Sequence, residues 1–146
     1  IASYICEDCL IVPSKAKTKE EVIAELVDLL VQKGKICDAN TVYEDVMKRE
    51  TSVSTGLEKG IAIPNARSEC VNGIVLACTL CPAGIDFQAL DNKPSKLIFL
   101  IVSGTKESGP HLQLLAAIAK KMHDQSILDK ALKATDAKAL YRIIRQ

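Results

Sequence analysis

The stretch "KLIFLIVSG", residues 96 to 104, constrains the fold more than any other part of the chain. Its centre is an unbroken run of Leu, Ile, Phe and Val, without the polar alternation of a strand that has one face in water. Such a run predicts a central strand that is covered on both faces, so helices must lie on either side of its sheet. The run is far shorter than the roughly 20 residues of a membrane-spanning helix, and no direct membrane insertion is expected.

Two helical patterns precede this strand. Thr18 with a glutamate three residues later has the form of a capping box, and apolar residues recur at helical spacing until a stop at Gly34. A second capping box that begins at Thr41 predicts a helix ending near Arg49. The next dozen residues, "ETSVSTGLEKGI", show no period and are expected to form a loop.

Three further helices are predicted after the apolar strand. Pro110 is expected to open the first of them; its inner face is assigned to Leu112, Leu115, Ile118, Ala119 and Met122. "SILDKALKA" and "DAKALYRIIRQ" predict two shorter helices. Shorter strands are expected at "CLIVP", "IAIP" and "GIVLACTL", the last two joined by a connection of hairpin length or longer. The predicted class is α/β: a single domain over residues 1–146, with a mixed β-sheet flanked by helices on both faces.

Composition excludes several classes of function. A length of 146 residues supports one hydrophobic core, and the formal net charge of +1 gives no support to a nucleic-acid partner. The start "IASYICEDC" lacks a basic segment followed by a long apolar one, so no secretory signal is expected and the predicted location is cytoplasmic.

Six cysteines raise the alternative of a metal or redox module, because Cys6 with Cys9, and Cys78 with Cys81, have the spacing of half a zinc site. Cys78 and Cys81 fall in an expected strand, where residues three apart point to opposite faces and cannot share one ion. Small buried thiols in a reducing cytoplasm are the favoured interpretation, and no metal or cofactor is predicted.

Polar residues that could bind an anion lie in three separate segments. His111 falls in the first turn of a helix, where free amides and the helix dipole favour an anion and a neutral imidazole; an exposed histidine near a cap fits the local sequence equally well. Arg49 ends a helix just before "STG" (Ser54, Thr55, Gly56), whose hydroxyls and close backbone suit a phosphoryl group. Neither the position of Arg49 nor the "STG" tripeptide is by itself specific evidence for a phosphate site.

The longer string "KRETSVSTGLEKGIAIPNA", followed by "GIDFQALDNKPSKLIFLIVSG" and "HLQLLAAIAKKM", is specific. It resembles the enzyme IIA proteins of the bacterial phosphoenolpyruvate-dependent sugar phosphotransferase system, in the fructose/mannitol class that includes the nitrogen-regulatory relatives. The resemblance implies a histidine after "AIP" that takes a phosphoryl group from the carrier HPr and passes it to a cysteine of a IIB partner. In this chain that position is Asn65.

The resemblance also assigns the other site residues. It implies that Arg49 stabilises phosphate and that His111 is the second active-site histidine, with Ser54, Thr55, Gly56 and Pro64 at the phosphate- or partner-binding rim. Since an amide nitrogen is not nucleophilic, the leading hypothesis is a phosphotransfer-incompetent, regulatory protein that binds an HPr-like carrier, a IIB component or a regulated protein. The alternative is a working phosphoryl carrier, either through His111 or because Asn65 is an engineered replacement.

Overall fold

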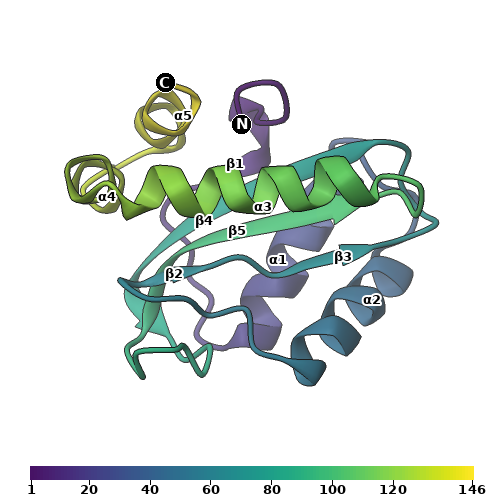
Figure 1. The fold of residues 1–146 in the computed structure, drawn as a ribbon, viewed down its shortest axis with the longest axis horizontal. Helices are drawn as coiled ribbons and strands as arrows, with labels where there is room; N and C mark the ends of the chain where they lie inside the picture. Colours follow the sequence, from purple (N-terminus) through teal and green to yellow (C-terminus); the bar gives the residue numbers. More distant parts are fainter.

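A five-stranded mixed sheet organises the protein (Figure 1) in a computed structural model that describes residues 1–146. The apolar run forms β5 (Ser95–Ser103), which pairs antiparallel with β4 (Ile74–Ile85) and parallel with β2 (Ile61–Ala62) and β3 (Asn65–Arg67). β1 (Leu10–Ile11) pairs parallel with β4. The predicted α/β class with one mixed sheet is confirmed.

Helices cover both faces of the sheet. α1 (Lys19–Gln32) and α2 (Ala39–Ser52) pack on one face, whereas α3 (Ser108–His123), α4 (Gln125–Leu132) and α5 (Ala137–Arg145) pack on the other. A short 3-10 helix, η1 (Glu7–Cys9), precedes β1. Alternate side chains of β5 enter the two cores: Ile98, Leu100 and Val102 face α1 and α2, and Leu97, Phe99 and Ile101 face α3, α4 and α5. All six are fully buried, as the unbroken apolar run predicts.

The expected capping box of α1 is present. The hydroxyl of Thr18 accepts a hydrogen bond from the backbone N–H of Glu21, and the Glu21 carboxylate accepts one from the backbone of Thr18. The second capping box was placed wrongly, because Asp38 rather than Thr41 caps α2 and accepts from the Thr41 N–H. α2 also continues to Ser52, so the first three residues of the predicted loop are helical.

The inner face of α3 differs from the predicted one. Leu112 is 64% exposed, while His111 is buried together with Leu114, Ile118 and Met122. These four follow one face at helical spacing, and the helix begins at Ser108 rather than Pro110. A histidine therefore occupies a position next to the core, and a leucine points outward beside it.

The connection between "IAIP" and "GIVLACTL" is longer than a hairpin turn, because β2 and β4 lie on opposite sides of β5. "NARSECVN", expected to be a connection, contributes β3, which forms only by pairing with β5. No helix is long and apolar enough to cross a bilayer.

The cysteines follow the expected pattern in one region only. Cys78 packs in the core under α3, α4 and α5, and Cys81 packs in the core under α1 and α2, as strand geometry requires. Cys37, just before α2, forms a disulfide with Cys70, just after β3. The expectation of reduced thiols throughout is therefore wrong for this pair.

Gly56 is predicted to tolerate no side chain. A Cβ added there would lie 2.8 Å from Cα of Ala89 and 2.9 Å from Cβ of Phe87, so a backbone segment would have to move. We expect Gly56→Ala to lower the free energy of unfolding by about 1–3 kcal/mol in urea denaturation. Gly109→Ala is the control, because nothing lies within 4 Å of that Cβ. An equal loss in both variants would contradict the steric explanation.

Candidate functional site

β3 forms an edge of the sheet and runs between α2 and α3 (Figure 1). Residues of these three elements line a polar pocket. Its volume is about 380 Å³. We call it the Arg49 pocket; its lining residues are Asp45, Lys48, Arg49, Ser52, Asn65, Ala66, Arg67 and His111. Three residues that the sequence placed in one site, Arg49, Asn65 and His111, are thus brought together from three elements.

Asn65 is held in place at both ends of its amide. Backbone pairing sets its position, because Asn65 lies opposite Ile101 in the parallel β3–β5 ladder. The side chain is 6% exposed, its Nδ2 donates to the carbonyl oxygen of Ile63 at 2.9 Å, and its Oδ1 lies 3.1 Å from Nε2 of His111. Every hydrogen-bonding end of the amide thus has a partner inside the protein.

The contacts of His111 identify its tautomer. An amide oxygen can only accept, so Nε2 of His111 donates to Asn65 Oδ1. In the neutral ring Nδ1 is then an acceptor, and the hydroxyl of Ser103, 2.6 Å away, donates to it. Burial lowers the pKa of His111 from its ordinary value of 6.5, and the positive charges of Arg67 and Arg49 lower it further. The ring is therefore neutral at pH 7.

An NMR titration should show this state directly. We expect the imidazole of His111 to titrate below pH 6.5, and its ¹⁵N shifts at pH 7 to show a protonated Nε2 and an unprotonated Nδ1. As the pH falls, His111 is protonated in the unfolded chain at a higher pH than in the folded protein. Its contribution therefore lowers the free energy of unfolding as the pH drops from 6.5 towards the folded pKa. His123→Gln assigns the two histidine signals. A protonated Nδ1 at pH 7 would contradict the hydrogen-bond assignment.

Positive charge dominates the pocket. Lys48, Arg49 and Arg67 line it, against the single carboxylate of Asp45. The guanidinium of Arg49 donates from Nη1 to the carbonyl oxygen of Val53 at 2.9 Å, which holds it at the end of α2. The guanidinium of Arg67 donates to the hydroxyl of Ser108 at 2.5 Å. An anion is the ligand that this arrangement suits.

Arg67 lines the pocket but was not predicted from the sequence as a site residue. Residues two apart on a strand share a face, so Arg67 follows Asn65 towards the same side of β3. That signal was hidden because a three-residue strand containing asparagine and arginine resembles a loop. Pro64, immediately before Asn65, is buried and accepts a hydrogen bond from the N–H of Ile101 through its carbonyl oxygen at 3.1 Å. It supports the ladder and is absent from the pocket lining.

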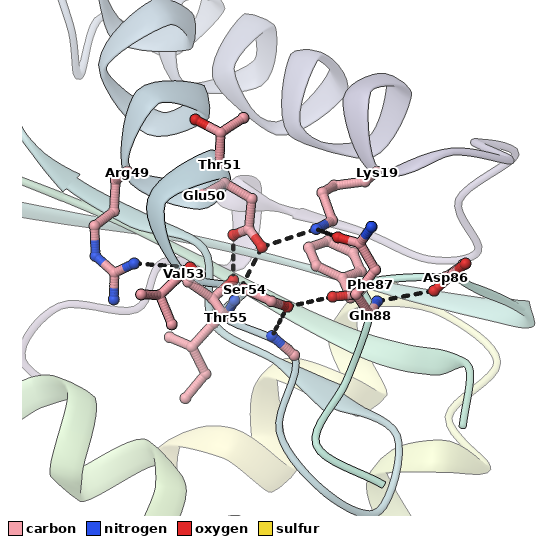
Figure 2. A network of polar contacts seen from close by, with 12 residues as sticks. Lys19, Arg49, Glu50, Thr51, Val53, Ser54, Thr55, Asp86, Phe87 and Gln88 are labelled. Carbon is pink, nitrogen blue, oxygen red and sulfur yellow. Dashed lines mark hydrogen bonds and ion pairs between the residues drawn. The ribbon is translucent and has the colours of Figure 1, made fainter. Parts of the chain in front are cut away.

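The hydroxyls of the "STG" segment are engaged elsewhere. Ser54 donates to the carbonyl oxygen of Phe87, and Thr55 donates to Glu50 both from its N–H, at 2.9 Å, and from its hydroxyl (Figure 2). Gly56 packs against Ala89 and Phe87. Ser54, Thr55 and Gly56 therefore do not line the Arg49 pocket, although they follow α2 directly.

A buried ion pair underlies this segment and was also missed. Glu50 is 3% exposed, and its carboxylate accepts from the ammonium group of Lys19 at 3.0 Å (Figure 2). The same ammonium donates to the side-chain oxygen of Gln88 at 3.1 Å and lies 5.2 Å from the ring centre of Phe87. Glu50, the residue after Arg49, thus connects α1, α2 and the "STG" segment. Lys19 and Glu50 are 31 positions apart in the sequence, which explains why no local pattern predicted the pair.

Comparisons with known proteins show the family and the fold of the chain. The family model described as "Phosphoenolpyruvate-dependent sugar phosphotransferase system, EIIA 2" matches residues 3–146. A fructose-specific EIIA component from Haloferax volcanii is 32% identical over 88% of this chain and 84% of its own length. The crystal structure of the nitrogen regulatory protein IIA-Ntr from Neisseria meningitidis has a TM-score of 0.90 at 26% identity, covering 98% of this chain and 97% of that one.

A third match extends the fold comparison. Enzyme IIAMTL from Escherichia coli, solved in complex with phosphorylated enzyme IIBMTL, has a TM-score of 0.82 at 20% identity. The match covers 96% of each chain. At this identity it shows a shared fold.

Proposed function

The chain belongs to the type 2 enzyme IIA family of the phosphoenolpyruvate-dependent sugar phosphotransferase system, and we propose that it is a member that carries no phosphoryl group and regulates by binding a protein partner. The observation that carries this proposal is the state of Asn65. Its amide is buried between Ile63 and His111, at the centre of a cationic pocket. The pocket has the surroundings of a phosphoryl site and an unreactive group at the acceptor position.

The chemical reason is the electronic structure of the amide. A neutral imidazole has a free nitrogen lone pair that can attack phosphorus and later leave. The asparagine nitrogen shares its lone pair with the carbonyl group, and here its N–H already donates to Ile63. Asn65 therefore preserves the hydrogen bonds of the pocket without supplying a nucleophile.

The proposed partner is a protein of the phosphotransferase system or a protein that it regulates: an HPr-like carrier, a IIB component or a regulated target. Complex formation of IIAMTL with phosphorylated IIBMTL supports a IIB component, and the nitrogen regulatory relative supports a regulated target. Leu112, the residue after His111, and Val53, whose carbonyl oxygen accepts from Arg49, are both exposed, which supports docking of a protein near the pocket. We place this activity in the cytoplasm, where these partners act.

A working phosphoryl carrier is the second candidate, with His111 as acceptor or with Asn65 as an engineered replacement for histidine. The hydrogen bonds of His111 argue that it does not accept the phosphoryl group. Nε2 carries a proton that it donates to Asn65, and Nδ1 accepts from Ser103, so neither nitrogen offers a free lone pair to phosphorus.

Intact-mass measurement tests the proposal. The protein is incubated with phosphoenolpyruvate, enzyme I and HPr, and we expect no gain of a phosphoryl group under conditions that phosphorylate HPr. An acid-labile gain of one group would overturn the proposal. The same assay on His111→Gln would then show whether His111 had been the acceptor.

A further inference from the structure

The disulfide between Cys37 and Cys70 joins the two walls of the Arg49 pocket. Cys37 precedes Asp38, the N-cap of α2, and α2 supplies Asp45, Lys48 and Arg49 to the pocket. Cys70 follows β3, which supplies the opposite wall with Asn65 and Arg67. The two cysteines are 33 residues apart, and their Cα atoms lie 5.2 Å apart. From this placement we propose that Cys37 and Cys70 form a reversible thiol–disulfide modification site that controls how firmly α2 is held against β3.

The local backbone favours reversibility. The N–H of Cys37 donates to the carbonyl oxygen of Cys70 at 3.1 Å, so a contact other than the covalent bond also holds the two segments together. The N–H of Cys70 in turn donates to the hydroxyl of Ser68 at 3.2 Å. After reduction, these bonds keep the two thiols close enough to pair again.

Exposure makes the site selective. Cys37 is exposed and Cys70 is half-buried, so a thiol reagent reaches the bond from solvent. Cys9, Cys78 and Cys81 are buried, and burial raises the pKa of each thiol, to about 11 for Cys9. Buried thiols that stay protonated are poor nucleophiles. Only Cys6 among the free cysteines is partly accessible.

The chemical step is two-electron thiol–disulfide exchange with a dithiol as reductant. A thiolate of the dithiol attacks one sulfur, the bond between Cys37 and Cys70 breaks, and the departing thiolate takes up a proton. The second thiol of the reagent then displaces the remaining protein sulfur. The products are two protein thiols and an oxidised, cyclic reagent. A small-molecule disulfide reverses the sequence and is itself reduced to two thiols.

The consequence is a change in the pocket. In the oxidised form the start of α2 is tied to the end of β3, and in the reduced form only hydrogen bonds and packing hold them. Because α2 is one rigid rod from Ala39 to Ser52, freedom at its first turn is transmitted to Arg49 near its end. The proposal does not depend on whether Asn65 prevents phosphoryl transfer, since it concerns the walls and not the acceptor.

The test compares the whole protein with and without dithiothreitol. Alkylation of the denatured, unreduced protein should modify four of its six cysteines, and all six after reduction. Reduction should lower the thermal midpoint by roughly 10 °C, because the bond closes a long loop of the unfolded chain. It should also raise amide hydrogen exchange several-fold in α2 and β3, but not in α5, and shift the imidazole signal of His111.

The double variant Cys37→Ser/Cys70→Ser is the matched control. It should behave like the reduced protein and show no response to dithiothreitol. Alkylation of all six cysteines in protein treated with oxidised glutathione would overturn the proposal, because the bond would not form. It would equally be overturned if reduction lowered the thermal midpoint but left the His111 signal and the exchange in α2 and β3 unchanged. The comparison of oxidised and reduced wild-type protein decides the matter even if the double variant fails to fold.

Discussion

Asn65→His is expected to convert a protein that gains no phosphoryl group into one that gains one per chain. The imidazole Nδ1–H can replace the Asn65 amide as donor to the carbonyl oxygen of Ile63, which leaves Nε2 unprotonated and directed into the pocket. Arg49 and Arg67 then face the incoming phosphoryl group. On the proposed function, the histidine supplies the missing nucleophile, so we expect phosphorylation to rise from none to one group per chain.

Intact mass after incubation with phosphoenolpyruvate, enzyme I and HPr measures this gain. Asn65→Gln is the matched control, because it alters the side chain but supplies no nucleophile. The double variant Asn65→His/His111→Gln should still accept the group, because His111 is not the acceptor. It should do so more slowly, because the variant loses the hydrogen bond that His111 donates at position 65. A folded Asn65→His variant that gains no phosphoryl group would show that the pocket has lost more than its acceptor.

Glu50→Ala is expected to lower the free energy of unfolding by about 3–5 kcal/mol, the usual range for removing one partner of a buried ion pair. The variant leaves the ammonium group of Lys19 buried with Gln88 as its only hydrogen-bond acceptor, and it deprives the Thr55 N–H and hydroxyl of theirs. Urea denaturation followed by circular dichroism measures the loss.

Two controls separate this effect from a general effect of losing a glutamate. Glu58→Ala removes an exposed carboxylate with no hydrogen-bond partner and should change stability by less than about 0.5 kcal/mol. Lys19→Met combined with Glu50→Gln removes the buried charges together and keeps an acceptor for Thr55, so it should recover most of the stability. A loss below about 1 kcal/mol in Glu50→Ala would contradict the importance of the pair.

Elements with strong local signals were predictable from sequence. β5 was evident because a strand buried on both faces must be apolar throughout, and α1 because its capping box and apolar stripe agree. β3 was not, since it is three residues long and exists only by pairing with β5. The start of α2 was misplaced because Asp38 and Thr41 are both good caps, and only the structure decides between them.

Some residues of the candidate site were also predictable from the sequence, whereas others were not. Arg49 and His111 were candidates from their positions at helix ends, and the resemblance to a family joined them with Asn65 in one site. No spacing rule links Glu50 to Lys19 or Cys37 to Cys70, whose contacts depend on how α1, α2 and β3 pack. The hydroxyls of Ser54 and Thr55 were expected at a phosphate and instead support the loop, because a serine or threonine binds whichever partner the fold brings nearest.

Pairing of Asn65 with Ile101 in the β3–β5 ladder has an evolutionary consequence. Main-chain hydrogen bonds between these strands, which any residue other than proline can make, determine where the side chain at position 65 sits. Selection can therefore exchange the side chain while the scaffold around it persists. On the proposed function, a lineage that no longer needs a phosphoryl carrier can keep its recognition surface at little loss of stability, with a single codon change between the silent form and the active one.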